Sequence, residues 1–172
     1  MKKLKLLFLL LLIGSTCWAF PQRIVSGMPS VTEMLYALDL GDRVVGVTTN
    51  CNYPSEAKKK EKVGGFFLNL EKIVSLKPDL IVMIEDAQRR DVQKFKNYGL
   101  KVFTINPRTV SDVMDSLIKL GEVTGKRRRA EQLAAQMQRR IGRLGSRGLD
   151  LEEVADGVEA LGGHLEPIPR LL

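Results

Sequence analysis

The feature that most constrains the fold is a regular alternation of short apolar runs with helical patterns, which starts near Arg23. Four runs rich in β-branched residues occur at 23–26, 44–47, 80–84 and 102–105. Helical patterns stand between and after them, at 30–40, 70–76, 89–98, 109–124 and 126–144. Strands that alternate with helices at this spacing form parallel sheets with helices on both faces. We therefore predict an α/β fold with roughly four parallel strands, followed by one long helix.

Local signals indicate where some of these elements begin and end. Ser30 is followed three residues later by Glu33, which is the pattern of a capping box. This pattern predicts a helix that begins at Ser30, continues through Leu40 and is ended by Gly41. The run at 80–84 is apolar almost throughout, which is typical of a strand buried on both faces.

The carboxyl ends of the predicted strands are the expected place for a ligand. In parallel sheets, ligands bind outside these ends. The segments that follow the four runs are 27–30, 48–53, 85–86 and 106–108. Together with the loop near residue 66, these segments are rich in apolar and amide side chains. Such a composition suits a bulky, partly apolar ligand. The candidate ligand-binding residues are Met28, Pro29, Ser30, Asn50, Cys51, Asn52, Tyr53, Phe66, Phe67, Glu85 and Asp86. For the two phenylalanines, the alternative is that they anchor a loop onto the domain.

The first 19 residues have the pattern of a secretory signal peptide. Three lysines among the first five residues precede an unbroken apolar run at 6–13, and small residues follow it. A membrane-spanning helix needs about 20 apolar residues, so this run is too short to be one. We predict cleavage after Ala19 and export to the periplasm. The alternative is a lipid anchor on Cys17.

The positive charge of the chain is concentrated on one element. The formal net charge is +7, and the three lysines of the leader carry three of these charges, which leaves +4. Residues 126–144 contain seven basic residues and one acid, so the rest of the mature chain sums to −2. The basic run has no interleaved aromatic residues, and export separates the protein from nucleic acid. We therefore expect no nucleic-acid partner.

Cysteine and histidine usage argues against a metal site, a disulfide and catalysis. Without Cys17, Cys51 is the only cysteine, which is expected to be a buried small residue, with a ligand or a dimer contact as the alternative. His164 is the only histidine, and no cluster has metal-ligand spacing. The chain has no nucleophile elbow, phosphate-binding loop or dinucleotide motif. We expect neither a cofactor nor an enzyme.

Short motifs in a fixed order carry a resemblance to a known family. They stand at 23–26, 29–33, 41–47, 52–54, 56–57, 63–65, 69–73, 76–81, 99–102 and 120–125. Each motif is weak alone, but their order and spacing over residues 23–143 are specific. The chain resembles the periplasmic substrate-binding proteins of ABC importers for vitamin B12, haem and ferric siderophores.

The resemblance implies a protein of two Rossmann-like lobes that are joined by one long helix and hold the ligand between them. It implies an N-terminal lobe at 20–125 and a connecting helix at 126–144. Glu71 matches the family position where a surface carboxylate pairs with arginines of the membrane permease. The alternative for Glu71 is an ordinary acid in the first turn of a helix, where the helix dipole favours it.

The resemblance leaves the ligand open among cobalamin, haem and a ferric siderophore. Cobalamin is the closest named ligand, through the motifs at 51–54 and 63–65. The aromatic residues that flank the corrin in the family are not matched, because Asn50 and Gly65 stand at or near their places. Phe66 and Phe67 are close enough in sequence to substitute for them.

The last segment, 145–172, departs from the family pattern. The family continues with a second lobe, whereas this segment ends at Leu172 and resembles nothing in that lobe. We expect it to be the product of a frameshift or truncation, and a one-lobed chain to bind its ligand weakly or not at all. Two other functions are compatible with these residues. One is an exported interaction or sensory module that retains the first lobe, and the other is an exported enzyme on the same sheet.

Overall fold

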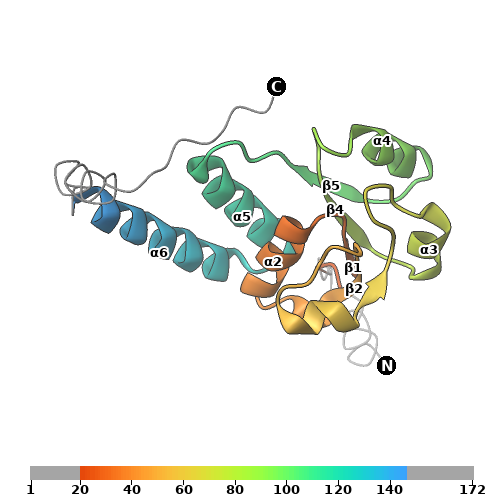
Figure 1. The fold of residues 1–172 in the computed structure, drawn as a ribbon, viewed down its shortest axis with the longest axis horizontal. Helices are drawn as coiled ribbons and strands as arrows, with labels where there is room; N and C mark the ends of the chain where they lie inside the picture. Colours follow the sequence, from red (N-terminus) through yellow and green to blue (C-terminus); the bar gives the residue numbers. More distant parts are fainter. Residues whose placement is uncertain (1–19, 147–172) are drawn as a thin grey trace, which may run out of the picture.

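The computed structural model describes residues 20–146 (Figure 1). The predicted leader with Cys17, the segment from 147 to 172 and His164 lie outside the described residues. The described part contains one parallel sheet in the order β3-β2-β1-β4-β5. Its strands are β1 (Ile24–Ser26), β2 (Val44–Val47), β3 (Glu61–Lys62), β4 (Leu80–Ile84) and β5 (Val102–Ile105).

The prediction of an α/β fold with a parallel sheet is confirmed, and the sheet has five strands where roughly four were predicted. The four apolar runs form the central strands and one edge, and the fifth strand is β3, which pairs with β2 through Gly46 and Glu61. This strand is only two residues long and is partly exposed at the edge of the sheet. Its charged residues carry no hydrophobic signal, so the sequence pattern did not reveal it.

Helices cover both faces of the sheet (Figure 1). One face carries α2 (Pro29–Ala37), α5 (Val110–Thr124) and the first part of α6 (Arg127–Ser146). The other face carries α3 (Leu70–Ser75) and α4 (Arg89–Asn97). Two short 3₁₀ turns, η1 (Gly41–Arg43) and η2 (Ser55–Lys59), flank β2. The strand β4 contributes side chains to both clusters, which confirms that it is buried on both faces.

The start of α2 differs from the predicted capping box. The N-cap residue is Met28, Pro29 occupies the first turn, and no side chain caps the helix. A proline at this position has no N–H to satisfy and has φ already set for a helix, so the helix begins before Ser30. The helix ends at Ala37, three residues earlier than predicted, and Gly41 begins the η1 turn instead.

The long helix α6 begins at Arg127 and continues to Ser146, two residues beyond the predicted boundary at 144. Its first half packs on the lobe along one face, where Ala130 is fully buried and Ala134 is 8% exposed. Its second half extends away from the sheet (Figure 1), and Ile141 is 42% exposed. Within residues 20–146, no helix has the length and apolarity needed to cross a bilayer.

Candidate functional site

A surface pocket of about 780 Å³ lies at the carboxyl ends of β4 and β5. Its walls come from the loop before α3, the β4–α4 loop with the start of α4, and the β5–α5 loop. The lining residues are Phe66, Phe67, Asp86, Ala87, Gln88, Arg89, Arg90, Asp91 and Arg108. We call this the strand-end pocket. Its position agrees with the rule that ligands bind outside the carboxyl ends of parallel strands.

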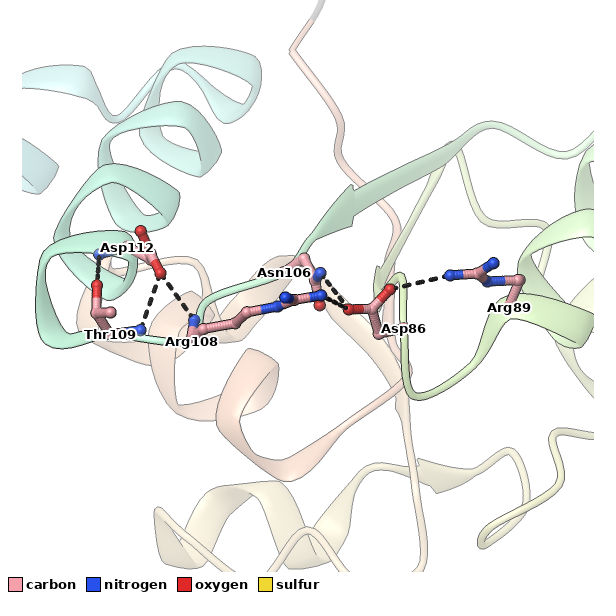
Figure 2. Close-up of polar contacts among 6 residues, drawn as sticks. All are labelled: Asp86, Arg89, Asn106, Arg108, Thr109 and Asp112. Carbon is pink, nitrogen blue, oxygen red and sulfur yellow. Dashed lines mark hydrogen bonds and ion pairs between the residues drawn. The ribbon is translucent and has the colours of Figure 1, made fainter.

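Asp86 is the centre of a polar network in the pocket (Figure 2). Its Oδ2 atom accepts hydrogen bonds from Asn106 Nδ2 and Arg108 Nη2, each at 2.6 Å. Its Oδ1 atom accepts from Arg89 Nη2 at 3.2 Å. Hydrogen bonds from Asn106 and then Arg108 stabilise the ionised carboxylate and lower the pKa of Asp86 to about 2. The network therefore fixes the loops after β4 and β5 relative to each other.

The backbone of Arg108 is held in place as well as its side chain. Thr109 is the N-cap of α5, and its Oγ1 atom accepts from Asp112 N at 3.1 Å. In return, Asp112 Oδ2 accepts from the backbone N–H groups of Thr109 and Arg108, at 2.9 and 3.0 Å. These backbone donors lower the pKa of Asp112. Because a capping box fixes the entry of the chain into a helix, the Arg108 side chain starts from a defined position.

The aromatic side of the pocket is a pair of exposed phenylalanines. Phe66 and Phe67 are 81% and 76% exposed, with ring centroids 5.1 Å apart in an edge-to-face arrangement. The alternative that they anchor the loop is wrong, because the neighbouring Leu68 is the buried residue. Leu68 N also donates to Asp91 Oδ2 at 3.3 Å. Two large apolar rings are thus free to contact a ligand.

Gln88 joins the pocket to the first strand. It is 8% exposed, and its Nε2 atom donates to the carbonyl oxygen of Gly27 at 2.8 Å. Its Oε1 atom accepts from Ile84 N at 3.2 Å. A buried amide with both ends satisfied makes a rigid connection between the loops after β1 and β4. Sequence reasoning missed Gln88, because nothing in the pattern distinguishes it from a surface residue.

The structure brings together three of the eleven ligand-binding candidates, namely Phe66, Phe67 and Asp86. Cys51 is 2% exposed, with its Sγ atom 3.1 Å from the hydroxyls of Thr32 and Thr48, so it is a core residue. The other candidates do not line the pocket: Met28, Pro29 and Glu85 are half-buried, and Ser30, Asn50, Asn52 and Tyr53 are exposed elsewhere. Three arginines, Arg89, Arg90 and Arg108, were not among the candidates.

Tyr53 lines a second pocket of about 570 Å³, between α2 and the β2–β3 connection. Acids dominate its rim, at Glu33, Asp39, Asp42 and Glu56, with Lys60 as the only lining cation among the described residues. Burial, Glu56 and Asp42 raise the pKa of Tyr36 in its wall. This pocket lies away from the ends of β4 and β5, and its charge would repel an anion. No group of three potential metal ligands occurs in the part of the chain that the structure describes.

The predicted docking residue Glu71 stands in the first turn of α3. Its side chain is exposed, and Asn69 caps the helix just before it by accepting from Lys72 N at 2.9 Å. The carboxylate is therefore presented to solvent from a fixed helix end. Both interpretations of Glu71, a permease contact and a first-turn acid, are compatible with this position.

Acid is expected to break the Asp86 network only at very low pH. The folded-state pKa of about 2 is below the ordinary value of 3.8, so the contacts are fully present above about pH 4 and are lost as the pH falls through 2. A ¹³C NMR titration of the Asp86 carboxyl group measures this directly. We expect a midpoint near 2 in the wild type and a higher one in Asn106→Ala. A wild-type midpoint near 3.8 would mean that the network does not form in solution.

Comparison with known proteins places the chain in a family. The model of the periplasmic binding protein family matches residues 24–148. An uncharacterised ABC transporter substrate-binding lipoprotein of Bacillus subtilis is 46% identical over 122 residues, which are 69% of this chain and 39% of that protein. A vitamin B12-binding protein of Pectobacterium carotovorum is 35% identical over 136 residues, 78% of this chain and 49% of that protein.

A solved structure shows the same fold. A periplasmic haem-binding protein of Pseudomonas aeruginosa matches with a TM-score of 0.68 and 28% identity, over 73% of this chain and 46% of that one. The chain thus spans about half the length, or less, of the relatives that it matches. The matched part is the lobe with the five-stranded sheet and the helix α6 that leaves it. Its motifs, its fold and these matches show that the chain belongs to the periplasmic binding protein family.

Proposed function

We propose that this lobe forms one wall of the substrate site of an exported ABC importer component, and that its substrate is an anionic, partly aromatic metal chelate. Haem and carboxylate-bearing ferric siderophores are chelates of this kind. The observation that carries the proposal is the strand-end pocket, which is lined by three arginines and by two exposed phenylalanine rings. The family itself acts by binding rather than catalysis.

The charges of the pocket favour a ligand with carboxylate groups. Asp86 is already engaged by Arg108 and Arg89, and Asp91 accepts a hydrogen bond from a backbone N–H. Each of the two engaged guanidinium groups uses one of its five N–H donors for this carboxylate in the described structure. Arg90 makes no ion pair with any residue of the described part. Several charge-assisted donors are therefore available to an incoming carboxylate.

The aromatic pair adds a surface for a flat ring system. Phe66 is 81% exposed, so almost its whole ring is open to contact. Aromatic rings stack in offset or edge-to-face geometry, and each such pair contributes about 0.5–1.5 kcal/mol beyond its buried area. A porphyrin or an aromatic chelator meets this requirement while its carboxylates reach the arginines. Cobalamin fits less well, because the side chains of its corrin ring are neutral amides.

The named relatives support the coarser part of the proposal. The proteins from Pectobacterium carotovorum and Pseudomonas aeruginosa are named for binding vitamin B12 and haem, respectively. The exposed carboxylate of Glu71 on α3 is our proposed contact for the permease of the importer. We also propose export to the periplasmic side, by cleavage after Ala19 or through a lipid on Cys17. A lipoprotein among the relatives supports a lipid anchor as a route in this family.

Ligand titration of the full chain tests the choice of substrate. We expect haemin to bind with micromolar or weaker affinity, because the described lobe offers a single wall and one wall buries only part of a ligand. Cyanocobalamin is expected to bind at least about tenfold more weakly than haemin, because the amides of its corrin ring offer the arginines neutral acceptors in place of carboxylates. Absorbance spectroscopy follows both ligands. Equal or tighter binding of cyanocobalamin would contradict the proposed substrate class.

A further inference from the structure

An apolar groove of about 270 Å³ lies where α2, α5 and α6 meet, away from the strand-end pocket. Leu117 of α5 is 4% exposed at the groove, and the other apolar walls include Met34, Val113, Leu133 and Met137. Arg140 of α6 and Glu33 of α2 stand at its polar edges. The groove belongs to neither the proposed substrate site nor the proposed permease contact.

The apolar surface continues along α6 beyond the groove. Leu133, Met137 and Ile141 follow one another at intervals of four residues, so they lie on one face of the helix. Ile141 is 42% exposed, and Val110 at the start of α5 is 54% exposed. Within residues 20–146, nothing covers this end of the stripe. An uncovered apolar stripe of this length indicates a contact surface.

Positive charge lines the same stretch of α6. Arg139 and Arg140 are exposed and form no ion pair within the described part of the chain. The surface therefore combines an apolar stripe with adjacent cations. A partner that fits it needs apolar side chains on one face of a helix and acids beside them.

The chain itself contains such a segment just after α6. Residues 149–161 carry five acids and no basic residue. Their apolar residues at 151, 154, 155, 158 and 161 have the spacing of one helical face. The acids at 150, 152, 153, 156 and 159 fall between them. This pattern is that of an acidic amphipathic helix, complementary in both charge and apolar character to the stripe on α6.

We propose that residues 151–161 dock as an antiparallel helix on the α2–α5–α6 groove and the stripe that leads to it. Residues 147–150, which include Gly148, provide the reversal after Ser146. A helix of eleven residues is about 16 Å long at 1.5 Å per residue, so it runs back along α6 from Ser146 to about the level of Met137. Val154 and Val158 then face Ile141 and Met137, and the acids lie near Arg139 and Arg140. This proposal is independent of the substrate class.

Engineered cysteines in the full chain test the docking. The variant Met137→Cys with Val158→Cys, in a Cys17→Ala background, places two thiols across the proposed contact, while Cys51 stays buried. Mild oxidation is expected to give an intramolecular disulfide in most molecules. The matched control, Met137→Cys with Ile168→Cys, places the second thiol beyond the docking segment and should remain reduced. A disulfide between two molecules would overturn the proposal in favour of a second copy on this face, and failure to cross-link would overturn it outright.

Hydrogen exchange gives a second readout that does not depend on cysteines. Val154→Asp with Val158→Asp is expected to increase amide exchange across residues 133–141 by about tenfold, because α6 loses its cover. The control, Leu165→Asp with Ile168→Asp, makes the same chemical change outside the docking segment and should leave exchange unchanged. Amides of β1 and β4 report whether the lobe is still folded. Equal exchange in the two variants would contradict the proposal.

Discussion

Replacing Gly121 by alanine is expected to destabilise the lobe by about 2 kcal/mol, because the new methyl group overpacks the crossing of α5 and α6. A Cβ atom at Gly121 would lie 2.6 Å from the Cβ atom of Ala130 and 3.1 Å from the carbonyl oxygen of Lys126. Neither neighbour is a flexible side-chain end, so the two helices must separate. Ala130 is fully buried at this crossing, and the separation exposes it.

Gly142→Ala is the matched control for this prediction. Gly142 also lies within a helix, but a Cβ atom there meets nothing within 4 Å. The same substitution should therefore stabilise α6 by about 0.5–1 kcal/mol, because alanine loses less backbone entropy in a helix than glycine does. Urea unfolding measures the free energy of unfolding of both variants. The comparison requires that the dependence of this free energy on urea concentration, the m value, is the same in both. Changes of the same sign in the two variants would contradict the described packing of α6 on α5.

Removing the charge of Arg90 is expected to weaken haemin binding about tenfold, the effect of one charge-assisted hydrogen bond. Arg90 lines the strand-end pocket and takes no part in the Asp86 network, so Arg90→Gln leaves the pocket intact. Combining it with Arg108→Gln should weaken binding by more than about a hundredfold, because Arg108→Gln also removes an ion pair of Asp86 in the pocket. The difference in binding affinity between haemin and cyanocobalamin should become smaller by the same factor.

Lys94→Gln is the control for the arginine variants. Lys94 is exposed on α4, one turn after Arg90, and it lies outside the pocket. The Lys94→Gln substitution removes the same charge from the same helix, so its haemin affinity reports any effect of net charge alone. We expect its haemin affinity to match that of the wild type. Equal losses in Arg90→Gln and Lys94→Gln would show that the pocket does not recognise carboxylates.

The central part of the fold was predictable because burial imposes a pattern on the sequence. Strand β4 is apolar over its whole length since it packs on both faces, and that is what the run at 80–84 shows. Strand β3 was not predictable, because two charged residues at a sheet edge need no apolar partner. At α2, the capping box predicted from Ser30 does not form, and Pro29 stands in the first turn instead, so the helix begins one residue before Ser30.

The pocket was predictable in position but only partly in composition. Parallel strands place a ligand site at their carboxyl ends. The sequence therefore predicted Asp86, which follows β4, and this residue lines the pocket. Arg89 and Arg90 begin a helix and look like solvated surface charges in a sequence. Their place in the pocket depends on a loop more than 20 residues earlier in the sequence, which carries Phe66 into the same pocket. The loop that carries Cys51 and Tyr53 has no periodic pattern, so the sequence did not show where their side chains lie. Cys51 is in the core, and Tyr53 lines the second pocket.

Ligand binding at the strand-end pocket is tested most directly by a hydrogen-exchange footprint of haemin on the full chain. The prediction is slower exchange in three segments, 64–68, 85–91 and 106–109, which form the pocket walls. The second pocket, lined by Tyr36 and Tyr53, should show no change. A footprint confined to that second pocket or to α6, with the three segments unaffected, would contradict binding at the strand-end pocket.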